Sequence, residues 1–267
     1  MGEGPVGESR AIFITGGGSG IGRAIAILFA GRGWQVGLAD VNPAGMDETA
    51  ALLPAGALTY VLDVCDREEW VRALDDFTSR AGRLDVLVNN AGIATGGALA
   101  NMSDADIDRV VAINFMGVIN GARAGHRHLK AMPGSVLLNI ASASAIWGSP
   151  GLAVYSATKF AVRGLTEALD GEWAADGIKV ASLMPGFIDT PLLTVNVAGS
   201  NRTARDGVVA AGLEFTAVER VAEAAWDAVH GDRLHTPVGP TAKRLTFAAR
   251  WFPGNLRRQM KARRLGR

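Results

Sequence analysis

The chain has 267 residues, of which 48% are hydrophobic and 20% are charged, and its formal net charge at pH 7 is +1. This balance is typical of a globular protein with one core. The single cysteine, Cys65, excludes an internal disulfide and a cysteine-based metal cluster. Residues 1–9 lack the apolar core of a signal peptide, and no later run is long enough to span a membrane. We therefore expect a cytoplasmic protein with a flexible amino terminus at residues 1–9.

The first predicted unit is a strand, a glycine-rich turn and a helix, within residues 11–29. The apolar run 11–14 is typical of a strand that is buried on both faces, and apolar residues at helical spacing follow the turn. The turn holds five glycines, at Gly16, Gly17, Gly18, Gly20 and Gly22. Glycine permits close backbone approach, and the first turn of a helix presents unpaired N–H groups. This unit therefore predicts a pyrophosphate-binding site.

A second strand, predicted over residues 34–40, ends on Asp40, about twenty residues beyond the glycines. A carboxylate at that position can accept hydrogen bonds from the hydroxyls of an adenosine ribose and would repel a 2′-phosphate, which favours NAD over NADP. The glycine turn has no Lys or Arg before Arg23, so it offers no obvious partner for a 2′-phosphate. The alternative role for Asp40 is to cap a helix that begins near Pro43.

A third strand is predicted at residues 58–62, with a helix at 67–81. Asp63, directly after the strand, has two open roles, which are a contact to the adenine amino group and a cap for the following helix. Cys65 is interpreted as a small packing residue, because no cation lies near it in the sequence.

A fourth strand, at residues 86–88, leads into Asn89 and Asn90, which we expect to fix the end of this strand against the glycine turn. The long helix predicted at 104–130 places Asn114 near a buried stripe, where its amide needs a helix end, another helix or a water as partner. His126 and His128 lie on different faces of this helix, and we expect no metal site.

A fifth strand, at residues 135–140, leads into a loop of small residues that includes Ser142, at the sheet edge where ligands bind in open parallel sheets. Tyr155 and Lys159 follow at a spacing of four residues, which puts both on one face of a predicted helix. A nearby ammonium lowers the pKa of a phenol, so this pair predicts a tyrosine that serves as an acid or base near neutral pH. A core tyrosine followed by an unrelated lysine is the alternative.

Several of these motifs occur together in an order and spacing that resembles the short-chain dehydrogenase/reductase family, over roughly residues 10–238. They are residues 15–22 (TGGGSGIG), 89–92 (NNAG), Asn114, Ser142, 155–159 (YSATK) and 185–186 (PG). The resemblance implies a Rossmann-like α/β fold of three layers, with one doubly wound, seven-stranded parallel sheet at residues 10–240. It also implies a nicotinamide cofactor, hydride transfer to or from a hydroxyl-bearing or carbonyl carbon, and a homodimer or homotetramer.

The resemblance also implies the roles of four catalytic residues. Tyr155 is expected to be the general acid/base, and Lys159 to lower the pKa of Tyr155 and to hold the nicotinamide ribose. Ser142 is expected to bind the substrate oxygen, and Asn114 to keep a water that links Lys159 to solvent. The family often has a serine where this chain has Ala141, which puts none of these roles in doubt.

Cofactor contacts are expected along one edge of the sheet, where the glycine turn, the strand ends and the catalytic helix meet. The expected residues are Gly16, Gly18, Ser19, Gly20, Ile21, Gly22, Asp40, Val41, Asp63, Val64, Asn90, Ala91, Gly92, Tyr155, Lys159, Pro185, Gly186, Ile188 and Thr190. The last four follow a sixth strand predicted at residues 179–184. NAD is the expected cofactor, and no metal is expected.

Residues 189–213 are expected to form a mobile lid over the substrate, because they are small and polar and lie where the family has such a lid. The expected substrate contacts are Ser142, Ser144, Trp147, Ala94, Thr95 and Leu192. Trp147 could instead pack beneath the loop. The largely apolar set favours a hydrophobic alcohol or ketone.

Beyond a helix at 217–230 and a last strand at 234–238, the tail 241–267 holds nine basic residues and no acidic one. The favoured interpretation is a solvated helix packed by Leu245, Phe247, Trp251 and Phe252. The alternative is contact with an anionic membrane surface, an acidic substrate or a partner subunit. No motif supports nucleic-acid binding.

Three functions remain open at this stage. The preferred function is an NAD-dependent oxidoreductase that acts on a secondary alcohol or ketone. The second is an NADPH-dependent carbonyl or 3-oxoacyl reductase of the same family. The third is a catalytically silent cofactor-binding scaffold, against which the presence of Ser142, Tyr155 and Lys159 argues.

Overall fold

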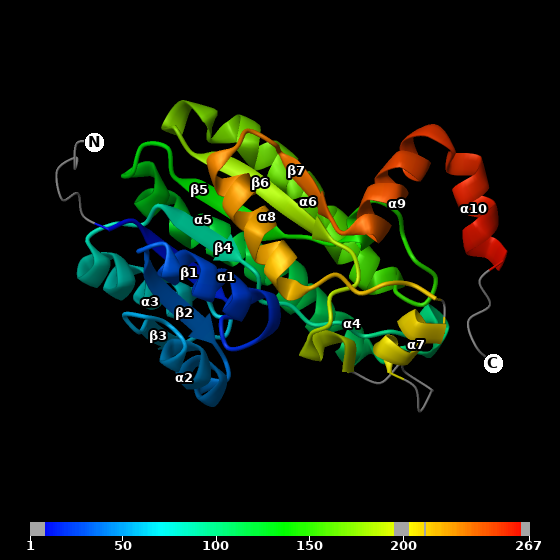
Figure 1. Ribbon diagram of the computed structural model, residues 1–267, viewed down its shortest axis with the longest axis horizontal. Coiled ribbons are helices and arrows are strands. Elements are labelled where there is room, and N and C mark those ends of the chain that lie inside the picture. The colour runs from blue at the N-terminus through cyan, green and yellow to red at the C-terminus, as the bar shows by residue number, and fades with distance from the viewer. Residues whose placement is uncertain (1–8, 195–202, 211, 263–267) are drawn as a thin grey trace.

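A computed structural model describes residues 9–194, 203–210 and 212–262 of the chain. Within these residues, seven parallel strands form one sheet in the order β3-β2-β1-β4-β5-β6-β7. The strands are β1 Ala11–Thr15, β2 Gln35–Asp40, β3 Leu58–Val61, β4 Val86–Asn89, β5 Val136–Ile140, β6 Lys179–Pro185 and β7 His235–Val238. The strand order reverses between β1 and β4, which is the doubly wound arrangement predicted from the sequence. Figure 1 shows the sheet running through the molecule.

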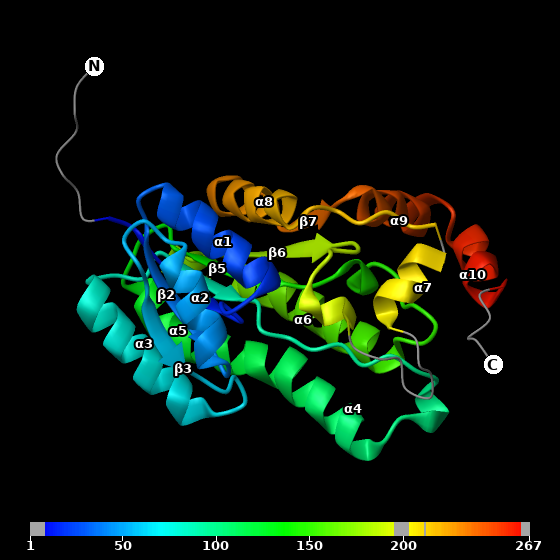
Figure 2. The same cartoon turned by 60° about the horizontal axis from the view of Figure 1, so that its bottom comes forward.

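Helices cover both faces of the sheet, so the molecule has three layers (Figure 2). The helices are α1 Gly20–Gly31, α2 Pro43–Ala51, α3 Arg67–Ala81, α4 Asp104–Val111, α5 Gly117–Lys130, α6 Ala153–Glu172, α7 Ala204–Ala210, α8 Val218–His230, α9 Pro240–Trp251 and α10 Pro253–Ala262. Short 3₁₀ turns lie at Leu99–Asn101, Ala143–Ala145, Ala174–Asp176 and Pro191–Thr194. Helices α1, α2 and α8 share one core with the sheet, and α3, α5 and α6 share the other.

Alternation of side chains along β1 explains these two cores. Ile12 and Ile14 pack toward α1 and α8, whereas Phe13 points to the opposite face. The Phe13 ring meets the Phe77 ring of α3 edge-on, with a centroid separation of 5.3 Å. All five residues of β1 are buried, as the apolar run predicts for a central strand.

The long helix predicted at residues 104–130 is present as α4 and α5, joined by a π-helical segment at Ala112–Met116. This segment contains Asn114, whose side chain is fully buried. π-Helical turns within α-helices are often found at functional sites, because the extra residue redirects side chains. No sequence signal predicted this interruption.

The structure excludes the capping alternative for both Asp40 and Asp63. Asn42, and not Asp40, caps α2, because its side chain accepts a hydrogen bond from the Gly45 N–H at 3.3 Å. Asp66, and not Asp63, caps α3, where its Oδ1 accepts hydrogen bonds from the N–H groups of Glu68 and Glu69. Each true cap stands directly before its helix, which is the position from which a short side chain reaches the first-turn N–H groups.

Cys65 differs from its predicted packing role, because it is exposed. Its thiol is nevertheless a poor nucleophile, since partial desolvation of the sulfur and the neighbouring Asp63 carboxylate raise its pKa to about 11. The sequence-based view that no cation activates this thiol therefore agrees with the structure.

The basic tail forms α9 and α10 in the described residues. Leu245 is half-buried, but Phe247, Trp251 and Phe252 are exposed, so the predicted packing of these three rings was wrong. The inward face of α9 is instead made of small residues and Leu245. No described helix combines the length and the apolar character needed to cross a membrane.

Candidate active site

The glycine turn between β1 and α1 depends on glycine at defined positions. Gly16 has φ of +65°, and a Cβ placed on it would lie 2.8 Å from the Asn90 amide nitrogen. A Cβ on Gly22 would lie 2.2 Å from the carbonyl oxygen of Gly16. Neither position accepts a larger residue without movement of the backbone, so the turn depends on glycine at both positions.

The first turn of α1 has no side-chain cap. Ser19 is the N-cap residue, but its hydroxyl makes no capping hydrogen bond, and no acidic residue lies in the first turn. The N–H groups at the positive end of the helix dipole are therefore open to an anion. A dinucleotide pyrophosphate fits this arrangement of glycine turn and uncapped helix.

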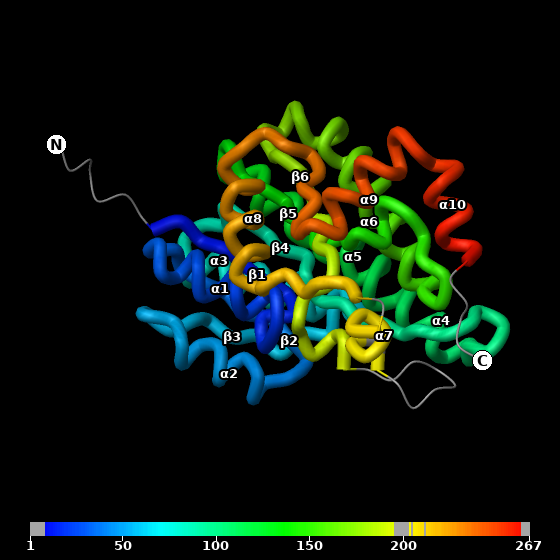
Figure 3. Tube along the Cα trace, turned by 45° about the vertical axis from the view of Figure 1, so that its right-hand side comes forward, coloured from blue at the N-terminus to red at the C-terminus, as the bar shows by residue number. Residues whose placement is uncertain are grey.

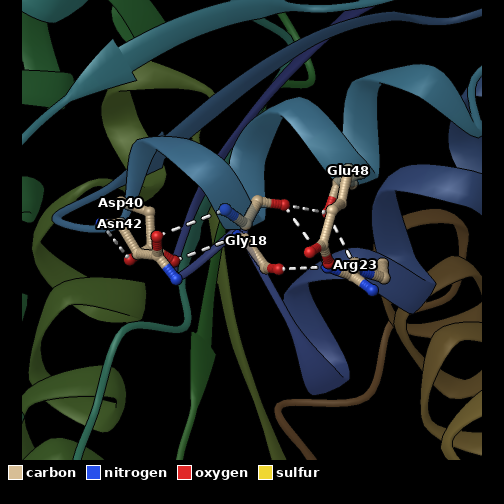
Figure 4. Close-up of polar contacts among 7 residues, drawn as sticks. Gly18, Arg23, Asp40, Asn42 and Glu48 are labelled. Atoms are coloured by element: carbon tan, nitrogen blue, oxygen red, sulfur yellow. Dashed lines mark hydrogen bonds and ion pairs between the residues drawn. The ribbon is translucent and has the colours of Figure 1, made fainter.

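Polar side chains hold Gly18 from both sides (Figure 4). Asp40, at the end of β2, accepts a hydrogen bond from the Gly18 N–H at 3.0 Å. Arg23 of α1 donates to the Gly18 carbonyl oxygen at 2.6 Å and to Glu48 of α2 at 2.8 Å. The Arg23 guanidinium also donates to Thr49 Oγ1 at 2.9 Å. The glycine turn is thus joined to β2 and α2, and the cation nearest to it is already paired.

Asn90 fixes the end of β4 against the glycine turn, as predicted. Its amide nitrogen donates to the Thr15 carbonyl oxygen at 2.8 Å and to that of Gly16 at 3.2 Å. Thr15 completes the connection, because its hydroxyl accepts the N–H groups of Asn90 and Ala91. Asn89 instead joins Asn139 of β5 inside the core, at 3.0 Å.

Asn114 finds its partner in a loop and not at a helix end. Its Oδ1 accepts from the Ile93 N–H and its Nδ2 donates to the Ile93 carbonyl oxygen, both at 2.8 Å. A Cβ placed on Gly92 would lie 3.2 Å from Asn114 Oδ1 and 3.7 Å from Lys159 Nζ. Asn114 and Lys159 therefore converge on the backbone at Gly92.

Ser142, Tyr155 and Lys159 gather at the carboxyl end of β5. The Tyr155 hydroxyl interacts with the side chain of Ser142, which caps the 3₁₀ turn after the strand. Lys159 is buried, donates to the Ile140 carbonyl oxygen at 2.9 Å, and has its Nζ 5.7 Å from the centre of the Tyr155 ring. The geometry thus assembles the three side chains that the sequence motif predicted to act together.

The pKa values in this group differ from the sequence-based prediction. Burial raises the pKa of Tyr155, and the interaction with Ser142 opposes this rise. Burial also lowers the pKa of Lys159 to about 8. Desolvation penalises the charged forms of both groups, and the ammonium points to a carbonyl oxygen, so the predicted lowering of the Tyr155 pKa by Lys159 is not observed here.

The loop after β6 reaches the glycine turn. A Cβ placed on Gly20 would lie 3.3 Å from the side chain of Thr190. Ile188 is buried and forms a backbone bridge with Thr216, and the N–H of Gly186 donates to the Val238 carbonyl oxygen. This segment therefore lies beside the glycine turn, and its predicted contact with the nicotinamide stays a prediction.

The predicted lid is described at residues 189–194, 203–210 and 212–213. Its remaining residues, 195–202 and 211, lie outside the described part of the chain, as do residues 1–8 of the predicted flexible terminus. Asp189 and Arg205 form a two-point ion pair of 2.8 and 3.0 Å, which ties α7 to the end of the β6 loop. This pair lowers the pKa of the Asp189 carboxyl.

The remaining predicted residues are placed as follows. Asp63 is exposed and accepts a hydrogen bond from the Cys65 N–H at 2.9 Å, while Val64 is buried beside it. Val41 is exposed next to Asp40. Among the substrate candidates, Ser144 is buried, whereas Ala94, Thr95, Trp147 and Leu192 are half-buried. The grouping of these side chains around a substrate stays a prediction.

His126 and His128 are directed to different carboxylates. His126 lies 2.8 Å from Asp176, and His128 lies 3.0 Å from Asp75. No group of three side chains suited to a metal ion is found among the described residues.

Sequence reasoning missed two contributors to the site. The hydrogen bond from Arg23 to the Gly18 carbonyl oxygen was not predicted. The available signal was the position of Arg23 in the first turn of the helix that follows the glycines. The buried connection from Asn89 through Asn139 to Thr166 was also missed. An asparagine inside the apolar run VLLNI was the available signal, because a buried amide requires partners.

The doubly wound sheet, the glycine turn before an uncapped helix, and the polar group at the carboxyl ends of the strands define a Rossmann-type nucleotide-binding protein. Residues 10–200 match the family model of the short chain dehydrogenases. The chain therefore belongs to the short-chain dehydrogenase/reductase family of oxidoreductases.

Two curated relatives illustrate the family. The chain is 36% identical to 3-oxoacyl-[acyl-carrier-protein] reductase FabG of Thermotoga maritima over 188 residues, which cover 69% of this chain and 76% of that protein. It is 37% identical to L-2,3-butanediol dehydrogenase of Corynebacterium glutamicum over 188 residues, covering 68% of this chain and 73% of the relative. Among solved structures, a short chain dehydrogenase/reductase of Burkholderia phymatum in complex with NAD is 26% identical. The alignment covers 97% of this chain and 98% of that one, with a TM-score of 0.82.

Proposed function

We propose that this protein is an NAD-dependent oxidoreductase that interconverts a secondary alcohol and a ketone, with Tyr155 as general acid/base. The observation that carries the proposal is the grouping of Ser142, Tyr155 and the buried Lys159, whose Nζ lies 5.7 Å from the centre of the Tyr155 ring. These groups stand at the edge of the sheet to which the glycine turn also belongs. The arrangement suits proton exchange with an oxygen atom held between Ser142 and Tyr155.

Each side chain has a separate task in this proposal. The nicotinamide cofactor, when bound, accepts or supplies the hydride. Ser142 donates a hydrogen bond to the substrate oxygen and stabilises the charge that develops there. Tyr155 takes the hydroxyl proton during oxidation and returns it during reduction. Lys159 holds the nicotinamide ribose, and Asn114 keeps a water that connects Lys159 to solvent.

The preference for NAD rests on Asp40 and Arg23. Asp40 places a carboxylate beside Gly18, where it would accept hydrogen bonds from the ribose and repel a 2′-phosphate. Arg23, the nearest cation in the turn, is occupied by Gly18 and Glu48. The NAD complex of the Burkholderia phymatum relative supports the same preference. The proposed cofactor contacts are those predicted from the sequence.

A second candidate function is an NADPH-dependent 3-oxoacyl reductase. The relationship to the Thermotoga maritima reductase supports this function, because its name specifies a 3-oxoacyl substrate. The relationship to L-2,3-butanediol dehydrogenase supports the secondary alcohol instead. We propose a homodimer or homotetramer, as the family resemblance implies, and a location in the cytoplasm.

The test is to compare kcat/KM for NAD and NADP with a panel of steroid, aliphatic and aromatic secondary alcohols. We expect turnover with NAD, and we expect Tyr155→Phe to abolish turnover while NAD still quenches or shifts the tryptophan fluorescence of the protein. A clear preference for NADP would overturn the role of Asp40. Turnover that persists in Tyr155→Phe would overturn the role of Tyr155, and a chain that binds NAD but turns over none of the panel would support a silent scaffold.

A further inference from the structure

Three aromatic side chains at the carboxyl-terminal end of the described chain are exposed together. Phe247, Trp251 and Phe252 have exposed fractions of 60%, 61% and 51%. The rings of Phe247 and Phe252 are in contact, with centroids 5.8 Å apart. Transfer of large aromatic rings out of water is favourable, so an exposed group of them indicates an interaction surface.

This surface belongs to the outward face of α9. Ala242, Leu245 and Ala249 face the body of the protein, and they pack near the 3₁₀ turn that follows Ser142. Lys243, Phe247 and Arg250 occur at helical spacing on the side exposed to solvent. The helix is therefore amphipathic, but its outer face combines rings with cations where an ordinary surface helix would be only polar.

The helices that carry the rings are also rich in exposed cations. The described exposed basic residues of this region are Lys243, Arg244, Arg250, Arg257, Arg258 and Lys261. Residues 241–267 contain no acidic residue. The guanidinium of Arg250 lies 5.4 Å from the centre of the Trp251 ring, so charge and ring occupy one site on the surface. Arg244 is 3.8 Å from Glu214, an exposed pair that screening by water makes weak.

Both helices lie at one end of the molecule, remote from α2 and β3, and α10 packs against α9 (Figures 1, 2 and 3). Leu256 of α10 is buried and Met260 is half-buried, which leaves the basic residues of that helix exposed. The end of the molecule therefore presents aromatic rings and cations together to its surroundings.

We infer that α9 and α10 dock this protein onto an anionic lipid bilayer. Phe247, Trp251 and Phe252 would enter the boundary between head groups and acyl chains, while the surrounding arginines and lysines contact lipid phosphates. Aromatic rings bordered by Lys and Arg are the composition that interfacial helices use.

A second copy of the chain fits this surface less well than a bilayer does. In a two-fold symmetric contact the same patch meets itself, so the basic residues of one copy would face those of the other. With no acidic residue in the segment to compensate, this contact would bring like charges together. An anionic bilayer has the opposite charge and an apolar layer beneath it, and so complements both features.

The experiment is cosedimentation of the full chain with vesicles of phosphatidylcholine alone or mixed with phosphatidylserine in equal parts. We expect binding to the mixed vesicles that raised salt weakens, because screening reduces attraction between exposed charges. Phe247→Ser/Trp251→Ser/Phe252→Ser and Arg257→Gln/Arg258→Gln/Lys261→Gln should each reduce partitioning by about tenfold or more. Leu52→Ser/Val61→Ser is the matched control, since these apolar residues are also exposed but lie far from the tail.

Sedimentation velocity of the same proteins separates the alternatives. Equal pelleting with both vesicle types, or no pelleting with either, would overturn the proposal. If Phe247→Ser/Trp251→Ser/Phe252→Ser abolished an oligomer and the unaltered chain bound no vesicles, the surface would be a subunit contact. That outcome would also overturn the proposal of bilayer binding. All substituted residues are exposed. If the variant with three aromatic-to-serine substitutions fails to fold, the variant with Arg257→Gln/Arg258→Gln/Lys261→Gln alone decides the outcome.

Discussion

Asp40 accepts a hydrogen bond from the backbone N–H of Gly18 at 3.0 Å, so one carboxylate serves both the end of β2 and the glycine turn. Its other oxygen accepts the N–H of Asn42 at 3.1 Å. A residue held at two points has little freedom, and a cofactor ribose would meet a carboxylate already in position. This rigidity makes Asp40 suitable as a discriminator between cofactors.

The first prediction concerns the charge of Asp40. Asp40→Asn keeps an oxygen that can accept the Gly18 N–H but removes the negative charge that would repel a 2′-phosphate. We expect the ratio of kcat/KM for NADP to that for NAD to rise by about tenfold or more, which is the equivalent of ~1.4 kcal/mol. Steady-state kinetics with both cofactors measures this ratio. An unchanged ratio would show that the carboxylate does not discriminate.

The second prediction concerns Glu48, which pairs with Arg23 at 2.8 Å. Glu48→Gln removes the counter-charge and leaves Arg23 as an uncompensated cation beside the glycine turn. The Glu48 side chain is 69% exposed, so water screens the pair, and we expect the same ratio to rise only about twofold to fivefold. Glu68→Gln breaks a comparable exposed pair with Arg72 and is the control. If this ratio rose equally in Glu48→Gln and Glu68→Gln, the effect would not come from Arg23 beside the glycine turn.

Much of this fold follows from hydrophobic patterning. Strands β1, β4 and β5 in the middle of the sheet are short buried runs, and helix α3 begins at Arg67 and ends at Ala81, as its periodicity predicts. Caps were less predictable. Asp40 and Asn42, or Asp63 and Asp66, are chemically similar candidates within three residues of each other, and only the backbone path selects the one that reaches the N–H groups.

Parts of the candidate site that lie within one sequence motif were predictable. Contacts between segments far apart in the sequence were not. The spacing of Tyr155 and Lys159 alone predicts that both lie on one face of a helix. The pairing of Asn114 with Ile93 depends on a π-helical turn and a loop, and no local sequence rule encodes that contact. The pKa values also depend on burial, which the sequence does not specify at single residues.

The third prediction uses the pKa of Lys159, which burial lowers to about 8 from its ordinary value of 10.5. Between these two pH values the unfolded chain binds the proton that the folded protein has released, so the free energy of unfolding rises with pH. Below about pH 8 both states are protonated, and the folded protein carries the full cost of the buried charge, roughly 3 kcal/mol. Lys159→Met removes this cost.

We therefore expect the free energy of unfolding of the unaltered protein, relative to that of Lys159→Met, to increase by up to roughly 3 kcal/mol between pH 8 and 10.5. Denaturant unfolding of both proteins across this range gives the difference directly, and it cancels the titration of groups common to both. A difference that stays constant with pH would mean that Lys159 keeps its ordinary pKa in the folded protein.

The fourth prediction concerns close packing beneath the site, at Gly121 of α5. A Cβ at this position would lie 2.3 Å from Asn89 Oδ1 and 2.6 Å from the Trp70 ring, both of which are buried. Gly121→Ala must therefore displace α5 from the sheet or disturb the bond between Asn89 and Asn139. We expect a loss of about 1–3 kcal/mol in the free energy of unfolding.

Gly164, in the middle of α6, is the matched control, because a Cβ there meets no atom within 4 Å. Gly164→Ala should stabilise the protein by about 0.5–1 kcal/mol, since alanine has the higher helix propensity. Thermal or denaturant unfolding of the two variants tests the opposite signs. If Gly121→Ala were as stable as Gly164→Ala, the close contact of α5 with Asn89 and Trp70 would not exist in solution. The end of β4 would then not be held in place by this contact.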